Sequence, residues 1–268
     1  MLIIDASRDR YLDSAARAYP ENDAGPRSVA VEHWMEVIIN EKPAMRVVCT
    51  PEHLDELVVG RLLTEGLVRD PEEIETVYIC EQGLRARVLL RKEAAERLSA
   101  AEGSTVDTCC TDNRTLLQSR AREIPPVKPL AWRKEWVLQL AERMRREEPL
   151  YQETHAVHGC YLARKDQILC CREDIGRHNA MDKAIGWACI QKADLSQCLL
   201  FTTGRMPSDM VSKAVRGGVP VLASKTYPSD LGVRLAKQAR LTLITARPGG
   251  EWIVWNDGTE EPEDGRDG

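Results

Sequence analysis

The second half of the chain alternates between apolar runs and helical patterns, and this alternation constrains the fold more than any other feature. Runs with the composition of strands occur at 156–163, 167–171, 198–203, 219–224, 241–246 and 251–255. Segments with helical periodicity occur at 177–190, 208–216 and 229–239. Strands that are connected through helices form largely parallel sheets with helices on both faces. Residues 131–255, which open with an amphipathic helix over 132–146, are therefore predicted to form an α/β domain.

The first half of the chain predicts a smaller α+β domain over residues 28–101. Its strands are expected at 28–39, 44–49, 74–80 and 84–90, and a short helix at 93–100. Between the second and third strands, Thr50 is the expected N-cap and Pro51 the expected first residue of a helix that ends near Gly66. We expect a loosely held arm at 1–27 and a long, mobile, cysteine-bearing linker at 102–130. The acidic tail, 256–268, is expected to be disordered.

Charge and hydropathy exclude several classes of partner. The 268 residues suffice for one large or two modest domains. The net charge of −5 gives no reason to expect a nucleic-acid or membrane partner. No apolar run approaches the roughly 20 residues that a membrane-spanning helix needs, and no secretory signal is visible. A cytoplasmic protein is therefore expected.

The nine cysteines divide into two kinds. Their odd number and irregular spacing argue against a disulfide framework and favour a reducing compartment. Several lie in apolar surroundings and are predicted to be small buried side chains: Cys49, Cys80, Cys160, Cys189 and Cys198. Cys170 and Cys171 end an apolar strand, where packing is again the expected role. Cys109 and Cys110 instead lie in a polar segment, so they are either reactive thiols, an accidental surface pair or an adjacent-residue disulfide.

The stretch Cys171–Lys183 places many polar side chains directly after a predicted strand. A helix that begins at Arg177 puts alanine, methionine and isoleucine side chains on one arc, and His178, Asn179, Asp182 and Lys183 on the other. Such a polar arc can be merely solvated. Its position in the first turn, where N–H groups and the helix dipole favour an anion, instead predicts a functional site.

Polar, Gly- or Pro-containing segments follow the predicted strands at 173–179, 203–207, 225–230 and 245–250. In an α/β sheet, ligands bind beyond the carboxyl ends of the strands. Four such segments on one rim favour a phosphorylated or nucleotide ligand. The alternative is that these segments only cap helices, with Ser208 and Ser229 as the caps.

The motifs of several enzyme classes are missing from the sequence. Zinc deaminases combine His-x-Glu with Pro-Cys-x-x-Cys, and neither occurs here. His155 and His158 lie three residues apart, but at a predicted strand start and without a Cys-x-x-Cys. There is also no phosphate-binding Walker loop, no Gly-x-Gly-x-x-Gly and no Gly-x-Ser-x-Gly. No protein-bound metal is expected.

The run Glu173–Lys183, EDIGRHNAMDK, closely resembles the EDVGRHNAVDK signature of the FdhD/NarQ family, the formate dehydrogenase accessory sulfurtransferases. Further similar segments lie at Thr50-Pro51, 57–67, 203–205 and 213–221. The resemblance covers roughly residues 28–255. It implies a cytidine deaminase-like, three-layer α/β fold without zinc ligands. It also implies transfer of persulfide sulfur from a cysteine desulfurase to the molybdenum cofactor, a bis-molybdopterin guanine dinucleotide, for formate dehydrogenase.

The resemblance also implies roles for particular residues. Family members usually carry Cys-Gly-x-Cys-Gly where this chain has Cys109-Cys110-Thr111-Asp112-Asn113. Alignment of the first cysteine gives Cys109 the persulfide, and Cys110 is the alternative acceptor or a resolving thiol. The implied cofactor-binding residues are Gly176, Arg177, His178, Asn179, Asp182, Lys183, Thr203, Gly204, Arg205, Thr245, Ala246, Arg247, Pro248, Gly249 and Gly250. The implied partners are the desulfurase and the catalytic subunit of formate dehydrogenase, and a homodimer is the default oligomer.

Two main hypotheses follow from the sequence. The first is a sulfurtransferase in which Cys109 or Cys110 forms a persulfide. The second is a chaperone that binds the guanine-dinucleotide cofactor and docks to the dehydrogenase without sulfur chemistry, and the missing second cysteine of the loop motif favours it. A zinc nucleobase deaminase is a weaker third hypothesis.

Overall fold

The computed structural model describes residues 3–5, 15–22, 25–99, 106–107, 114–115, 124–144 and 146–260. The chain divides into two compact units. Unit 1 consists of Met1–Glu123, Glu147–Cys160 and Cys170–Ala193, and unit 2 consists of Ile124–Arg146, Tyr161–Leu169 and Asp194–Gly268. The predicted boundaries at 28–101 and 131–255 therefore differ from this division, because the helix at 177–190 packs with the N-terminal half of the chain.

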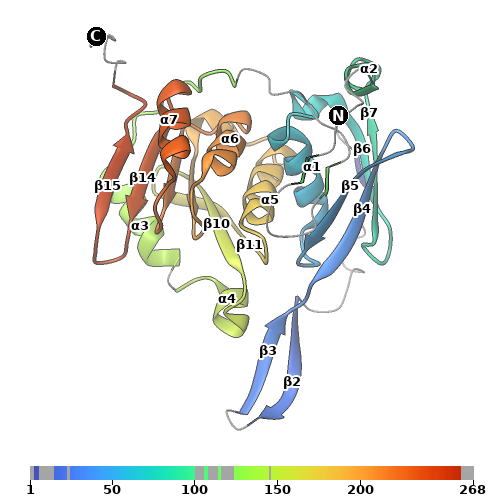
Figure 1. Cartoon of the computed structure of the whole chain (residues 1–268), viewed down its shortest axis with the longest axis horizontal. Coiled ribbons are helices and arrows are strands. Elements are labelled where there is room, and N and C mark those ends of the chain that lie inside the picture. The colour runs from blue at the N-terminus through green and yellow to red at the C-terminus, as the bar shows by residue number, and fades with distance from the viewer. Residues whose placement is uncertain are drawn as a thin grey trace. The chain divides into compact units, whose positions relative to one another are not determined.

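The main sheet of unit 1 has the strand order β1-β6-β7-β4-β5-β9-β8. Its strands are β1 (Ile3–Asp5), β4 (His33–Ile39), β5 (Lys42–Cys49), β6 (Ile74–Ile79), β7 (Arg85–Leu90), β8 (Val106–Asp107) and β9 (Arg114–Thr115). Pairs β4–β5, β6–β7, β5–β9 and β8–β9 are antiparallel, whereas β1–β6 and β4–β7 are parallel. A separate hairpin of β2 (Ala16–Asn22) and β3 (Gly25–Ala30) stands apart from this sheet in Figure 1.

The helices of unit 1 are α1 (Leu54–Thr64), α2 (Lys92–Ser99), α4 (Pro149–Thr154) and α5 (Arg177–Ile190), with a short 3₁₀ turn at Pro71–Glu73. Helices α1 and α5 lie side by side (Figure 1), and their backbones meet at two glycines. A Cβ atom on Gly60 would lie 1.8 Å from the carbonyl oxygen of Asp182, and one on Gly186 would lie 1.8 Å from that of Glu56. Only glycine permits this helix–helix distance.

Unit 2 contains most of a second sheet, whose strand order is β11-β10-β12-β13-β14-β15. The strands are β10 (His158–Arg164), β11 (Gln167–Asp174), β12 (Leu199–Thr202), β13 (Val221–Ser224), β14 (Thr242–Ala246) and β15 (Trp252–Asn256). Strands β12, β13 and β14 are mutually parallel, and β15 is antiparallel to β14. Every residue of the three parallel strands is buried, as expected for a sheet that is covered on both faces. The predicted α/β class is confirmed.

The helices of unit 2 are α3 (Lys134–Met144), α6 (Ser208–Arg216) and α7 (Asp230–Gln238), with a 3₁₀ turn at Leu195–Gln197. Helices α6 and α7 pack against each other and contact β13, β14 and β15, and α3 contacts β12 and β14 (Figure 1). The hydroxyl of Ser229 accepts from the Gly232 N–H at 3.1 Å and caps α7, as predicted. The predicted cap at Ser208 is wrong, since Pro207 is the N-cap of α6 and has no capping side chain.

Four predictions about local structure are wrong. The arm at 1–27 contains β1, β2 and the start of β3, so it is not merely loose, and the expected strand 28–39 divides into β3 and β4. Helix α1 begins at Leu54 with His53 in the left-handed region (φ 54°), so Thr50 is not its N-cap. The tail prediction fails at residues 256–260, where the Gly258 N–H donates to Thr242 Oγ1 at 3.0 Å.

Candidate functional site

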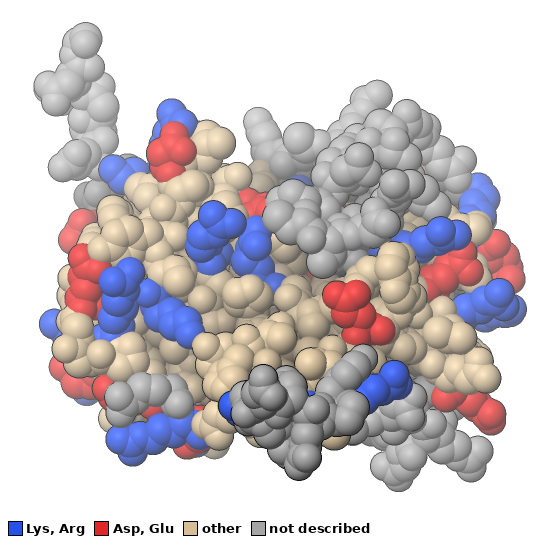
Figure 2. Space-filling view, turned by 60° about the horizontal axis from the view of Figure 1, so that its bottom comes forward, with Lys and Arg blue, Asp and Glu red and all other residues tan. Residues whose placement is uncertain are grey.

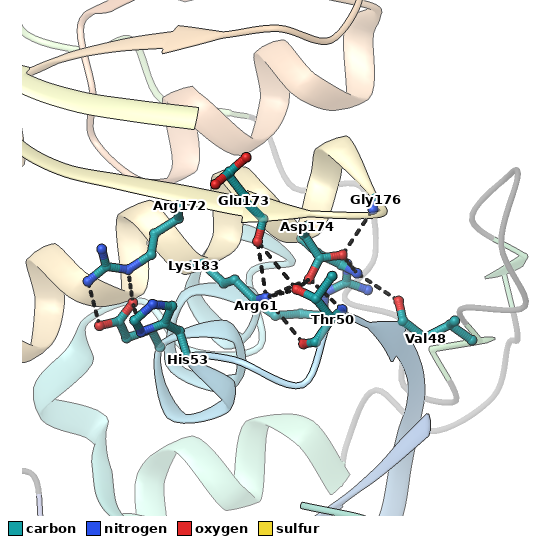
Figure 3. Close-up of polar contacts among 11 residues, drawn as sticks. Val48, Thr50, His53, Arg61, Arg172, Glu173, Asp174, Gly176 and Lys183 are labelled. Atoms are coloured by element: carbon teal, nitrogen blue, oxygen red, sulfur yellow. Dashed lines mark hydrogen bonds and ion pairs between the residues drawn. The ribbon is translucent and has the colours of Figure 1, made fainter. Parts of the chain in front are cut away.

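The N-terminus of α5 binds a carboxylate, and the carboxylate belongs to the chain itself. Gly176 is the N-cap of this helix and provides no side chain. Oδ1 of Asp174 accepts from the Gly176 N–H at 2.9 Å and from Nδ2 of Asn179 at 2.8 Å (Figure 3). The predicted anion is therefore present, but Asp174, at the end of β11, supplies it.

Lys183 forms the centre of a buried polar cluster. Its Nζ lies 2.6 Å from Oδ2 of Asp174 and 2.7 Å from Oγ1 of Thr50, and it also donates to the carbonyls of Thr50 and Glu173 at 3.3 Å (Figure 3). The Thr50 N–H and hydroxyl donate to the same carboxylate oxygen at 3.0 and 3.1 Å. All three side chains are fully buried. A carboxylate and several oxygens thus replace the water that the lysine side chain loses on burial.

A second buried ion pair joins α1 to α5. Nε of Arg61 lies 2.9 Å from Oδ2 of Asp182, and its Nη2 donates to Oδ1 of Asn179 at 2.8 Å. The hydroxyl of Thr64 donates to Oδ1 of Asp182 at 2.6 Å, and Asn179 Nδ2 also donates to the Val48 carbonyl at 2.7 Å. Burial alone would lower the pKa of Arg61, but the carboxylates of Asp182, Glu65 and Asp174 together outweigh burial and raise it. The guanidinium therefore stays charged.

These contacts correct part of the predicted cofactor site. Asn179, Asp182 and Lys183 are fully buried and bonded to other residues of unit 1, so they turn no polar atom outward. Gly176, Arg177 and His178 are half-buried.

Two further side chains of β11 connect this strand to helices of unit 1. The carboxylate of Glu173 accepts from the backbone N–H groups of Leu150 and Tyr151, at 3.0 and 2.8 Å, and so holds the first turn of α4. Burial is the main reason that the pKa of Glu173 is raised. Arg172 binds the Glu56 carboxylate of α1 with two nitrogens, at 2.5 and 2.9 Å (Figure 3). The end of β11 thus positions α1, α4 and α5.

Sequence reasoning missed the N-terminal half of this cluster. Thr50 and Arg61 lie more than 115 residues before their α5 partners, and no local pattern marks either as a partner of α5. The only signal is the Thr50-Pro51 dipeptide, which sequence reasoning assigned to a helix cap.

Three of the four predicted rim segments meet in unit 2, at the carboxyl ends of the parallel strands. The Gly204 carbonyl accepts from the hydroxyls of Ser224 and Thr226, both at 2.7 Å. Oγ1 of Thr245 donates to the Thr226 carbonyl at 2.9 Å and accepts from the Trp255 indole at 2.9 Å. These hydroxyls connect three consecutive loops into one rigid edge. The fourth segment, 173–179, belongs to unit 1.

The Arg247 side chain at this edge contacts three other residues. Its Nε donates to the Lys225 carbonyl at 3.0 Å, Nη1 lies 3.7 Å from the Glu251 carboxylate, and its guanidinium lies 5.1 Å from the ring centroid of Tyr227. The Tyr227 hydroxyl also bonds to Glu251. Arg205, Arg247, Gly249 and Gly250 are exposed and Pro248 is half-buried, whereas Thr203, Gly204, Thr245 and Ala246 are buried. Among the predicted residues of this edge, the exposed ones are therefore the two arginines, Gly249 and Gly250.

The predicted catalytic cysteines, Cys109 and Cys110, lie outside the described residues. In the sequence they lie between β8, which ends at Asp107, and β9, which begins at Arg114. In β9, Arg114 pairs with Arg46 of β5, and Asp107 of β8 pairs with Arg114. Strands β8 and β9, which flank the two cysteines in the sequence, form one end of the unit 1 sheet.

The described cysteines are thiols, and burial raises the pKa of several of them. Cys49, Cys160 and Cys198 are buried, as predicted, and so is Cys170, whereas Cys80, Cys171 and Cys189 are half-buried. Burial raises the pKa of Cys49 and that of Cys160. It also raises the pKa of Cys189 to about 12, with a contribution from the Asp70 charge. Thiols with a raised pKa are poor nucleophiles at neutral pH.

Larger-scale features of the described residues add little to the site. No helix among them is long and apolar enough to cross a membrane. No group of three or more His, Cys, Asp and Glu side chains in the described ranges could hold a metal ion. On the face drawn in Figure 2, basic side chains lie in small groups among acidic and uncharged ones.

Comparisons with known proteins agree with this geometry. The model of the FdhD/NarQ family matches residues 30–259. The chain is 30% identical over 230 residues to a sulfur carrier protein FdhD of Bacillus subtilis, covering 85% of this chain and 87% of the relative. It is 29% identical over 221 residues to a protein of the same name from Listeria innocua, covering 81% and 85%.

A solved structure shows the same fold. This crystal structure, from Desulfotalea psychrophila, is described as a formate dehydrogenase accessory protein. It superposes with a TM-score of 0.70 at 28% identity, over 91% of this chain and 97% of that one. The family model and these relatives cover nearly all of both units. The chain belongs to the FdhD/NarQ family.

Proposed function

We propose that this protein is a sulfur carrier that serves a formate dehydrogenase. The observation that carries the proposal is the match, over more than four fifths of the chain, to relatives named sulfur carrier protein FdhD. In the proposed sequence of events, a cysteine desulfurase supplies the sulfur. Cys109 or Cys110 carries it as a persulfide, and the bis-molybdopterin guanine dinucleotide cofactor of the dehydrogenase receives it.

The loading step requires only thiol chemistry. The thiolate of Cys109 or Cys110 attacks the terminal sulfur of the donor's cysteine persulfide, a new S–S bond forms and the donor's S–S bond breaks. The donor cysteine leaves as a thiolate and takes the proton that the acceptor thiol lost. No external oxidant is needed, because the sulfur moves between the two proteins in the same oxidation state.

The edge loops of unit 2 have the properties that binding of the cofactor cargo requires. Arg205 and Arg247 present exposed guanidinium groups, which bind phosphate oxygens well. Gly249 has a φ of 63° and no heavy atom within 4 Å of the position that a Cβ would occupy. A ligand can therefore approach the backbone there. We propose that this edge binds the diphosphates of the guanine dinucleotide, with Arg247 held in place by Lys225 and Glu251.

Intact mass after incubation with a cysteine desulfurase and cysteine tests the sulfur-carrier proposal. The wild type is expected to gain the mass of one sulfur atom, reversibly with a reductant. Cys109→Ala or Cys110→Ala is expected to abolish the gain, whereas Cys189→Ala, which removes a thiol that burial protonates, should not. The absence of a persulfide on both loop cysteines in the wild type would contradict the proposal.

A cofactor-binding chaperone without sulfur chemistry is the second candidate. One observation favours it: the chain has Asp112 where the resemblance to the family leads us to expect a second cysteine. Under this alternative, Arg247→Ala would weaken binding of the guanine dinucleotide and lower dehydrogenase activation. Replacement of Cys109 and Cys110 by alanine would leave that activation unchanged.

A further inference from the structure

The outer face of the unit 1 sheet carries an unusual concentration of exposed apolar side chains. Of the nine large hydrophobic residues that are exposed in the described part of the chain, four lie on or beside β4, β6 and β7. They are Trp34, Tyr78, Leu84 and Leu89, with exposures between 40% and 49%. Scattered single residues of this kind are normal, but a group on one sheet face indicates an interaction surface.

The strand register places three arginines among these side chains. Arg85, Glu36 and Arg46 lie opposite one another in neighbouring strands and so form one row across β7, β4 and β5. Arg87 lies two residues further along β7, opposite Ile38 of β4 and Tyr78 of β6. Trp34, Glu36, Arg46 and Leu84 line a hollow of about 250 Å³, together with Met35. We call Trp34, Glu36, Arg46, Leu84, Arg85 and Arg87 the Trp34 face.

The charge of the Trp34 face favours an acidic partner. Its arginines outnumber its one acid, Glu36, which lies 3.8 Å from Arg85. A second acid, Glu41, lies 3.9 Å from Arg87, and both side chains of this pair are well exposed. Pairs with this exposure contribute little and are readily exchanged for a partner's carboxylates. Tryptophan and arginine are also the side chains that most often dominate binding energy in protein interfaces.

The position of Cys109 along the chain indicates which partner this is. In the sequence, Cys109 follows Asp107, the last residue of β8, by two positions. Asp107 pairs with Arg114, and Arg114 pairs with Arg46 of the Trp34 face. A protein that hands sulfur to Cys109 must bring its own cysteine to that end of the sheet. The Trp34 face is the described interaction surface beside it.

We propose that the Trp34 face docks the sulfur donor: an acidic protein that presents a cysteine persulfide. Acidic side chains of the donor bind Arg46, Arg85 and Arg87, and an apolar side chain enters the hollow beside Trp34. This inference rests on the proposed sulfur-carrier function and adds the surface through which the carrier is loaded.

The test compares loading from a protein donor with loading from a small one. The Trp34→Ala/Arg85→Glu variant is loaded with sulfur from a cysteine desulfurase plus cysteine, and separately from glutathione persulfide. We expect the half-saturating desulfurase concentration to rise about tenfold or more, because two central interface side chains are lost. Loading from glutathione persulfide should match the wild type, since this donor needs no docking surface.

The matched control is Leu231→Ala/Arg234→Glu on α7. Leu231 is exposed like Trp34, and Arg234 is as exposed as Arg85 and also pairs with an acid, Asp230. This control should load like the wild type from both donors. Raised salt should weaken desulfurase loading of the wild type more than that of the Trp34-face variant.

The outcomes separate this inference from the proposed function. If the Trp34-face variant loads from desulfurase at wild-type concentrations, or loses loading from both donors, the docking inference is wrong. If the wild type loads from neither donor, the proposed function itself fails. If Trp34→Ala instead converts a wild-type dimer to a monomer, a second copy of the chain covers this face and the docking inference is wrong.

Discussion

Lys183 illustrates how a single charged side chain can depend on the whole of unit 1. Its ammonium group is enclosed by Asp174, Thr50 and two backbone carbonyls. Removal of one partner of a buried pair leaves the other charge uncompensated, and this cost exceeds the net stabilisation by the pair.

Lys183→Met should therefore lower the free energy of unfolding by about 3–5 kcal/mol, measured by urea denaturation. The double variant Lys183→Met/Asp174→Asn should recover part of this loss, because no charge remains unpaired. Lys92→Met, whose ammonium is exposed and pairs with Glu96 at 3.9 Å, should cost less than about 1 kcal/mol. Simple additivity of the two single losses in the double variant would rule out the coupling.

The Cys189 thiol provides a prediction about pH. Its pKa is raised to about 12, first by burial and then by the Asp70 carboxylate. Because only the thiolate reacts, alkylation of Cys189 by iodoacetamide should keep accelerating with pH up to pH 10 without a plateau. Asp70→Asn should lower the pKa of this thiol and speed its alkylation at any fixed pH. Peptide mapping by mass spectrometry separates Cys189 from the other cysteines, and a plateau below pH 10 would disprove the assignment.

The burial of this charge cluster could not be read from the sequence. The helical period correctly placed Asn179, Asp182 and Lys183 on one arc of α5, and that arc was expected to be functional. Its actual surroundings, Thr50 and Arg61, come from the other half of the chain. Residue spacing within α5 contains no information on what packs against its polar arc, so structural and ligand-binding roles look alike at that level.

At the scale of elements, the crossing of α1 and α5 depends on the absence of two side chains. Gly60→Ala and Gly186→Ala should each place a methyl group 1.8 Å from a carbonyl oxygen of the opposite helix. Since neither backbone can yield without breaking the ion pair between Arg61 and Asp182, each variant should lose at least about 3 kcal/mol. The Tm from calorimetry measures the effect.

Gly250→Ala is the matched control for these helix variants. A Cβ there would meet no atom closer than 3.4 Å, so the Tm should change little. A Tm of Gly60→Ala equal to that of the control would show that the helices can move apart at small cost.

Clear periodicity explains which elements were predictable. The bounds of α5 and α6 match the predicted ranges 177–190 and 208–216, because their apolar spacing is regular and their ends are marked by glycine or proline. Helix α4 and the β2–β3 hairpin were missed. The first turn of α4 is held by Glu173, a residue 22–23 positions away along the chain, and not by a local cap. The hairpin packs its Ala16 and Ala30 against Leu150 and Val157, which lie far along the chain.

At the scale of the whole molecule, the order of the sequence is not the order of the units. Unit 1 takes its third segment, with α5, from the second half of the chain. A fragment of residues 1–130 lacks Asp182, the ion-pair partner of Arg61. Such a fragment must either bury an unpaired guanidinium or leave α1 exposed, so we expect no cooperative unfolding transition. Circular dichroism during thermal unfolding measures this.

Mixing the 1–130 fragment with residues 131–268 should restore a cooperative transition. A cooperative transition of the 1–130 fragment alone would instead show that the first half of the chain is an independent domain, as its α+β pattern predicts. The intact chain is the reference in both measurements.

The β8–β9 hairpin has a consequence for kinetics. Cys109 lies in the sequence only two residues after β8 and five before β9, so its thiol lacks the long arm that some carrier proteins use to reach two distant sites. Donor and recipient must then occupy the same space around Cys109 one after the other, and each must depart before the other binds. This order of binding predicts a ping-pong mechanism. Double-reciprocal plots of the rate of sulfur delivery against recipient concentration, at several desulfurase concentrations, should give parallel lines.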